Sequence, residues 1–250
     1  MVSRYFPKDL VLYVSKTGFI SKDTWKEFFF PGGSIRWKNA FWVSLVERGY
    51  FLRHPNRRLQ DVYLLNRANR EVIEFMQGRC VRPPFLSQMN HDEILYRGIL
   101  SLAKSGFIAN WTTEAELKSF EQNSFKIESQ GRGIKYSDAI FTFRGDTKDL
   151  RVALEMEITQ KDRKRYIQIT SAYSSMTSLD CVIFIVGTKA IREVIEACLK
   201  EVYFPVDSIT VGFIEVSEWQ TSACDSIVRS TSLVSPMRNL SQNLTSKRPT

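Results

Sequence analysis

The segment VALEMEI (152–158) is an apolar, β-like run that two carboxylates interrupt. Side chains alternate between the two faces of a strand, so Glu155 and Glu157 share one face and the apolar residues between them share the other. A run this apolar is typical of a buried strand, where charge is unfavourable unless it has a purpose. We therefore expect both glutamates to be functional; the alternative is a strand face exposed to solvent.

A second strand is predicted at 136–144, and Asp138 stands at its start. If the two strands pair as an antiparallel hairpin, Asp138 lies near the far end of the strand that carries Glu155, and the three carboxylates converge. Oxygen ligands are those that Mg²⁺ and Mn²⁺ prefer, and such a metal can activate a nucleophile and stabilise charge on a phosphate. The sequence thus predicts a Mg²⁺ or Mn²⁺ site formed by Asp138, Glu155 and Glu157.

A helix is expected next, at 161–177. One of its faces carries side chains able to grip a phosphate or support a nucleophile, namely Lys161, Lys164, Arg165 and Gln168. Tyr166 and Tyr173 lie on a neighbouring stripe with Ile169, where simple packing explains them, although Tyr166 is also a candidate nucleophile.

An earlier helix is predicted at 90–106, with Asn90 as its N-cap and Glu93 three residues on, the spacing of a capping box. His91 projects from the buried side of this helix. Both His91 and Glu93 are therefore candidates for the catalytic site, and the alternative is that they only start and pack the helix.

The first eighty residues are basic and read as three short helices followed by a hairpin at 50–66. They contain 14 Lys and Arg against 7 Asp and Glu, a net charge of +7 in a chain whose total is +8. Three helices and a hairpin are the winged-helix pattern, so we expect DNA binding here; contacts with a protein are the alternative. The candidate DNA-binding residues are Arg36, Lys38 and Asn39 on the third helix and Arg57 and Arg58 at the tip of the hairpin.

The chain is expected to divide into a winged-helix domain (1–80), a mixed α/β domain (85–225) and a disordered basic tail (226–250), with Pro83 and Pro84 at the boundary. The fold class is therefore α/β (α+β). The four cysteines are scattered, which argues against a disulfide framework and fits a reduced cytoplasm. No signal peptide or membrane-spanning run is evident, so we expect a cytoplasmic protein without membrane insertion.

The segments SDAIF (137–141) and LEMEI (154–158) resemble the two signature strands of the PD-(D/E)xK nuclease superfamily. The resemblance implies a restriction-endonuclease-like core and a divalent metal. The chain departs from the pattern at Ser137, where proline is usual, and at Glu157, where lysine is expected. In that superfamily the following helix can supply the missing lysine, a role open to Lys161 or Lys164.

More narrowly, three segments behind an N-terminal winged helix resemble MobC-type plasmid relaxases and the related replication-relaxation proteins: HDEILYRGIL, KYSDAIF and LEMEITQKDRKRY. The resemblance implies metal-dependent, strand- and site-specific nicking of supercoiled plasmid DNA at a transfer origin, with an accessory mobilisation protein or a coupling ATPase as partner. The chain has only two histidines, His54 and His91, which excludes the histidine-cluster metal site of other relaxases.

The attacking group remains open between a water held by the metal and Tyr166, which would become linked to the DNA. Two other functions also remain open. One is a restriction-like or transposition-associated endonuclease. The other is a replication or regulatory DNA-binding protein without catalysis.

Overall fold

The computed structural model describes residues 6–30, 32–59, 61–119, 127–128, 134–145, 148–230, 234–240 and 242. The chain divides into two compact units, the N-terminal unit (Met1–Tyr96) and the C-terminal unit (Arg97–Thr250). The division falls inside helix α5 (Leu86–Lys104), beyond the boundary predicted at Pro83 and Pro84. The predicted helix start at Asn90 was wrong, because α5 begins four residues earlier and Asn90 lies within it.

The N-terminal unit combines short helices with a three-stranded antiparallel sheet. Its helices are α1 (Lys8–Thr17), α2 (Lys22–Thr24), the π-helical η1 (Trp25–Phe29), α3 (Ile35–Glu47), the short 3-10 turn η2 (Arg57–Leu59) and α4 (Arg70–Met76). Its strands are β1 (Ile20–Ser21), β2 (Phe51–Arg53) and β3 (Val62–Leu65), in the order β1-β3-β2. The three predicted helices and the hairpin are present, and β1 is an element that the sequence pattern did not predict.

Side-chain caps fix where these helices start, because the first N–H groups of a helix lack partners within it. Ser21 Oγ accepts from the Thr24 N–H at 3.0 Å, and Ser34 Oγ accepts from the Trp37 N–H at 3.3 Å. At the other end, α1 stops at Gly18, whose φ of 82° favours glycine. A β-carbon there would lie 2.7 Å from the Arg82 carbonyl oxygen, so the chain also needs glycine for close packing.

The N-terminal unit is held by an aromatic core in which Trp25 and Trp42 pack with ring centroids 4.8 Å apart. The residues of α3 that face this core are Trp42 and Leu45, both at most 2% exposed. Trp37, on the same helix, is 50% exposed.

The C-terminal unit is built on a seven-stranded mixed sheet in the order β12-β11-β10-β9-β8-β7-β4. The strands are β4 (Ile108–Thr113), β7 (Ala139–Phe143), β8 (Leu150–Glu157), β9 (Cys181–Val186), β10 (Thr210–Glu215), β11 (Ile227–Arg229) and β12 (Val234–Pro236). Strands β8, β9 and β10 run parallel, and every other neighbouring pair is antiparallel. A separate two-strand ladder joins β5 (Ile127–Glu128) to β6 (Ile134–Lys135).

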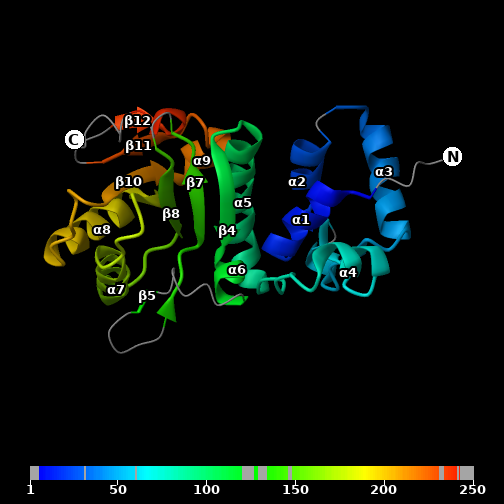
Figure 1. The fold of residues 1–250 in the computed structure, drawn as a ribbon, viewed down its shortest axis with the longest axis horizontal. Coiled ribbons are helices and arrows are strands. Elements are labelled where there is room, and N and C mark those ends of the chain that lie inside the picture. Colours follow the sequence, from blue (N-terminus) through cyan, green and yellow to red (C-terminus); the bar gives the residue numbers. More distant parts are fainter. Residues whose placement is uncertain are drawn as a thin grey trace. The chain divides into compact units, whose positions relative to one another are not determined.

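Parallel strands need crossover connections, and helices provide them here. The crossover helices are α7 (Arg163–Ser174), between β8 and β9, and α8 (Lys189–Glu201), between β9 and β10. The unit also contains α6 (Glu114–Ser119), α9 (Val216–Ser222) and the 3-10 turn η4 (Met237–Asn239). Helices α7 and α8 lie side by side against the sheet and share one buried core with the residues of β8, β9 and β10 that face them (Figure 1). Gly98 allows α5 to approach Trp219, since a β-carbon there would lie 2.1 Å from Trp219 Cε2.

The predicted α/β class is confirmed at the level of a mixed sheet with crossover helices. The prediction of a disordered tail at 226–250 was wrong for its first half. Strands β11 and β12 extend the sheet, and Val228, Met237 and Leu240 are fully buried.

Candidate functional site

The register of the β7–β8 hairpin brings Asp138 beside Glu155. Ala139 pairs with Leu154, so Asp138, one residue before it, stands level with Glu155. The Met156 N–H donates to Asp138 Oδ2 at 2.7 Å, which fixes the carboxylate against β8. The predicted hairpin and the position of Asp138 in it are therefore confirmed.

Glu155 and Glu157 both point to the face of the sheet that α7 and α8 cover. Ala153, Phe184 and Val186 belong to the core on this face, and the two-residue period places both glutamates beside them. Each glutamate is only 1% exposed. The alternative of a solvated strand face is thereby excluded, and the burial of two acids requires polar partners.

The partner of Glu155 is Tyr173, which reaches down from α7. The Tyr173 hydroxyl donates to Glu155 Oε1 and also contacts Ser137 Oγ at 2.7 Å. A phenol has one proton, so in this arrangement Ser137 donates to the phenol oxygen. Burial, followed by the charge of Glu155, raises the pKa of Tyr173 well above its ordinary value.

Tyr173 and Ser137 were missed as site residues by sequence reasoning. Tyr173 lies two helical turns after Tyr166, and Ser137 directly precedes Asp138. These sequence positions were the signals that could have pointed to the two residues. Neither position predicts that the Tyr173 hydroxyl contacts Glu155 on β8.

The partner of Glu157 is Lys161, whose Nζ lies 2.8 Å from Glu157 Oε1. The lysine side chain is 42% exposed, so its ammonium links a buried carboxylate to the surface. A basic group thus stands at the end of β8, as the interpretation of Lys161 as the replacement lysine requires. This arrangement supports the prediction without testing the lysine's catalytic role.

Lys161 precedes α7 and is not part of it. Asp162 caps the helix by accepting from the Arg165 N–H at 2.8 Å, so the helical stretch starts at Arg163. The predicted single helical face of Lys161, Lys164, Arg165 and Gln168 was therefore wrong for Lys161. Lys164 and Arg165 are exposed on the first turn of α7.

Tyr166 is fully buried, and its hydroxyl accepts from the Lys161 backbone N–H at 3.1 Å. Burial raises the pKa of Tyr166, an effect that the backbone hydrogen bond opposes and the charge of Glu157 reinforces. A buried phenol with a raised pKa is a poor nucleophile toward an external phosphate. The Tyr166 hydroxyl thus holds the backbone of Lys161, and its role as the attacking group stays a prediction.

His91 and Glu93 belong to the N-terminal unit, whereas the three carboxylates belong to the C-terminal unit. His91 Nδ1 lies 3.0 Å from Asp92 Oδ1 and 3.0 Å from Gln88 Nε2. Glu93 Oε1 accepts from the hydroxyls of Ser21 and Thr24 rather than serving as a capping-box residue. A catalytic part for His91 or Glu93 stays a prediction.

The candidate DNA-binding residues differ in how accessible they are. Arg36 is exposed at the start of α3, and Arg58 is exposed in η2 at the tip of the hairpin. Lys38 is partly buried and its Nζ donates to the Lys26 carbonyl at 3.4 Å, while Asn39 has a buried Oδ1. The side chain of Arg57 lies outside the described residues.

No group of three or more His, Cys, Asp and Glu side chains is arranged to hold a metal ion within the described ranges. The predicted three-carboxylate site is therefore not formed in this conformation. Glu155 Oε1 is hydrogen-bonded to Tyr173, and Glu157 Oε1 is paired with Lys161. The chemistry of the donor set nevertheless fits Mg²⁺ or Mn²⁺, because Asp138 and Glu155 present hard oxygens from adjacent strands.

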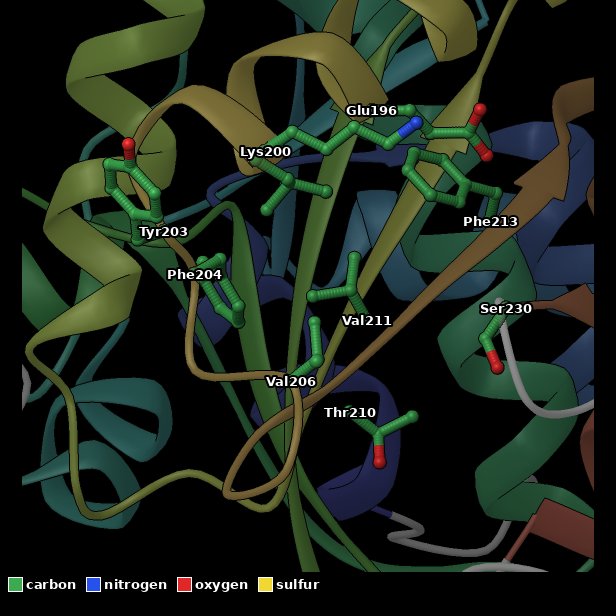
Figure 2. A pocket seen from close by; sticks show the side chains of 10 residues that line it. Glu196, Lys200, Tyr203, Phe204, Val206, Thr210, Val211, Phe213 and Ser230 are labelled. Carbon is green, nitrogen blue, oxygen red and sulfur yellow. The ribbon is translucent and has the colours of Figure 1, made fainter.

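A separate cavity of about 490 Å³ lies between α8, β10 and the loop that joins them. Figure 2 shows Phe204 and Val211 within it and Tyr203, Glu196 and Lys200 around it. None of the predicted site residues lines this cavity. It is an apolar hollow, distinct in composition from the carboxylate site.

The described part of the chain contains no helix that is both long and apolar enough to cross a membrane.

No protein-family model matches the chain, and no curated protein is significantly similar to it. Among solved structures, it is similar to the restriction endonuclease FokI bound to DNA, with 10% sequence identity and a TM-score of 0.29. The similarity covers 87% of this chain but only 44% of that one, and a TM-score this low does not establish a shared fold.

Proposed function

We propose that this protein is a divalent-metal-dependent DNA endonuclease of the PD-(D/E)xK type. The observation that carries the proposal is the hairpin β7–β8, which sets Asp138 beside Glu155 and ends in the Glu157–Lys161 pair. The SDAIF and LEMEI segments supply Asp138 and Glu155 to this pattern, and Lys161, in the segment after β8, supplies the basic group. Buried charge in the middle of an apolar sheet is rarely kept without a use.

Asp138 and Glu155 would hold the metal, and Glu157 would join them if Lys161 moved to the phosphate. When bound, Mg²⁺ or Mn²⁺ supplies neutralisation of phosphate charge and activation of water. Hydrogen bonds from neighbouring groups orient the two carboxylates. The Met156 N–H donates to Asp138, and the Tyr173 hydroxyl donates to Glu155.

Lys161 faces outward beside the carboxylates, since its side chain is 42% exposed and its backbone N–H is held by the Tyr166 hydroxyl. Its ammonium would contact the scissile phosphate. The reaction is hydrolysis: a water oxygen bonds to phosphorus, the bond to one sugar oxygen breaks, and that oxygen takes up a proton. Water is the attacking group because Tyr166 is buried.

The finer proposal is nicking at a plasmid transfer origin, which rests on the resemblance to MobC-type relaxases. The basic N-terminal unit would act as a winged helix that binds the origin. The residues proposed to touch DNA are Arg36, Lys38, Asn39, Arg57 and Arg58. Supercoiled plasmid DNA is then the substrate, and an accessory mobilisation protein or a coupling ATPase is the further partner.

One observation favours a second candidate, a replication or regulatory DNA-binding protein without catalysis. Glu155 and Glu157 already have partners in Tyr173 and Lys161, as purely structural buried acids would. In that case Asp138 and Glu155 stabilise the sheet only.

The deciding experiment compares wild type with Glu155→Gln on supercoiled plasmid, with and without a transfer origin, in Mn²⁺ and in EDTA. Glu193→Gln, at an exposed position of α8, is the matched control. We expect origin-dependent open circles in Mn²⁺ from wild type and from the control, and none from Glu155→Gln. Linear product from either plasmid would show that the protein cuts both strands, as a restriction-like endonuclease does. DNA binding without any cleavage would instead support the regulatory DNA-binding protein.

The products are also run on denaturing gels with and without proteinase. Ends that migrate identically indicate hydrolysis. A band whose mobility changes after proteinase treatment would show that protein is linked to the DNA. The attacking group would then be a tyrosine and not water.

A further inference from the structure

Trp37 is exposed in a way that the other tryptophans of the N-terminal unit are not. Its side chain is 50% exposed, whereas Trp25 and Trp42 are at most 2% exposed. The indole stacks on Phe41 with ring centroids 5.4 Å apart and planes inclined by 8°. Trp37 is thus the outer member of an aromatic cluster, supported from below and open to solvent.

Two glycines leave room beside this indole. Gly33 has a φ of 85°, and a β-carbon on it would lie 3.1 Å from Trp37 Cε3. A β-carbon on Gly32 would meet nothing within 4 Å. The resulting open hollow measures about 490 Å³ and is lined by Phe29, Phe30, Gly32, Gly33 and Trp37.

Basic residues stand on both sides of Trp37 in the sequence. Arg36 is exposed and directly precedes Trp37, and Lys38 directly follows it, with its Nζ 3.4 Å from the Lys26 carbonyl oxygen. Lys26 itself lies 3.9 Å from Asp23. The first eighty residues carry a net charge of +7, from 14 basic and 7 acidic side chains. A flat aromatic face with a basic border is complementary to a nucleotide, which combines a flat base with an anionic phosphate.

We propose that the hollow beside Trp37 binds an unpaired nucleobase, which stacks on the indole while its phosphates meet Arg36. The inference rests on the proposed function, because DNA is the partner, and deepens it: the N-terminal unit would hold an opened strand as well as duplex. Stacking accepts every base, so this contact gives strand preference with little sequence preference.

The test measures binding of the full chain to a single-stranded oligothymidylate, to a duplex of equal length, and to an abasic oligonucleotide with the same phosphates. Binding is followed by anisotropy of labelled DNA and by tryptophan fluorescence. We expect Trp37→Ala to weaken oligothymidylate binding about tenfold and Trp37→Phe to retain most of it. Oligothymidylate should quench wild-type fluorescence, and the abasic strand should not.

Val43→Ala is the matched control, because Val43 lies on the same helix and is 49% exposed. It should bind all three ligands as wild type does. Gly32 lines the hollow and a β-carbon there meets nothing within 4 Å, so Gly32→Leu adds bulk at its edge and should weaken oligothymidylate binding alone. The proposal is overturned if the Trp37→Ala variant binds oligothymidylate as tightly as wild type. It is also overturned if this variant loses equal affinity for duplex and for single strand, because Trp37 would then be a duplex contact.

The outcome is separable from that of the cleavage experiment. Glu155→Gln leaves Trp37 untouched, so its oligothymidylate binding and quenching should match wild type even if no plasmid is cut. Loss of quenching in Glu155→Gln as well as in Trp37→Ala would contradict a local stacking site.

Discussion

The hydroxyl of Tyr173 and the carboxylate of Glu155 meet in the core of the C-terminal unit, one from α7 and one from β8. The contact ties the crossover helix to the strand that carries both buried glutamates. Ser137 completes it from the segment just before β7. One phenol therefore links three segments that surround the candidate site.

Replacing Tyr173 by phenylalanine keeps the ring and removes the hydroxyl. Glu155 then loses this one hydrogen bond, and we expect the free energy of unfolding to fall by about 1–3 kcal/mol. Urea denaturation measures the change. Ser137→Ala should lose less, because the Tyr173–Glu155 bond remains; an unchanged midpoint for Tyr173→Phe would mean that the hydroxyl contributes nothing.

The raised pKa of Tyr173 predicts how stability depends on pH. The folded state keeps the phenol protonated at a pH where the unfolded chain, with a tyrosine pKa of 10.0, begins to lose the proton. This contribution is present below pH 10 and is lost as the pH rises toward the folded-state pKa. Wild type should therefore lose stability above pH 10 more steeply than Tyr173→Phe, as measured by urea midpoints across that range.

The Glu157–Lys161 pair should be energetically coupled. Lys161→Met leaves the buried Glu157 without this ion pair, and Glu157→Gln removes the charge that needs it. Because Lys161 is partly exposed, we expect a coupling of only about 1 kcal/mol from a double-mutant cycle. The exposed pair Lys189–Glu193 on α8 is the control and should give a coupling near zero. Equal couplings for the two pairs would show that burial of Glu157 adds nothing.

Metal binding should be visible without catalysis. Mn²⁺ at about 100 times its dissociation constant should stabilise wild type by about 2.7 kcal/mol, which thermal unfolding detects and EDTA reverses. Glu155→Gln should lose this stabilisation, and Glu193→Gln should keep it. Equal stabilisation of all three proteins would place the metal elsewhere, and none in wild type would favour the regulatory protein.

The hairpin, the shared face of Glu155 and Glu157 and the approach of Asp138 were all predictable, because a two-residue period and an antiparallel register determine them. The partners of the acids were not. Tyr173 meets Glu155 only through the packing of a helix on a sheet, which local patterns do not encode. Lys161 was placed in the wrong element because Asp162, a helix cap, was taken for a helical residue.

The predicted tail shows the limit of composition as a guide. Residues 226–250 are rich in Ser, Thr and Asn, yet Val228, Met237 and Leu240 are fully buried and β11 pairs with β10. Sparse apolar residues at the right positions suffice when a sheet edge is available to receive them. The frequency of polar residues does not reveal that edge.

This observation gives a prediction about truncation. A chain ending at Asp225 loses β11 and β12, exposes the edge of β10 and removes three fully buried apolar side chains. Burial of one such side chain stabilises by about 1.5–3 kcal/mol, so we expect the free energy of unfolding to drop by at least about 3 kcal/mol. A chain ending at Gln242 keeps both strands and should unfold at the same urea concentration as the full chain. If the two truncated chains are equally stable, the segment contributes no stability to the sheet, and the compositional prediction of a dispensable tail would hold after all.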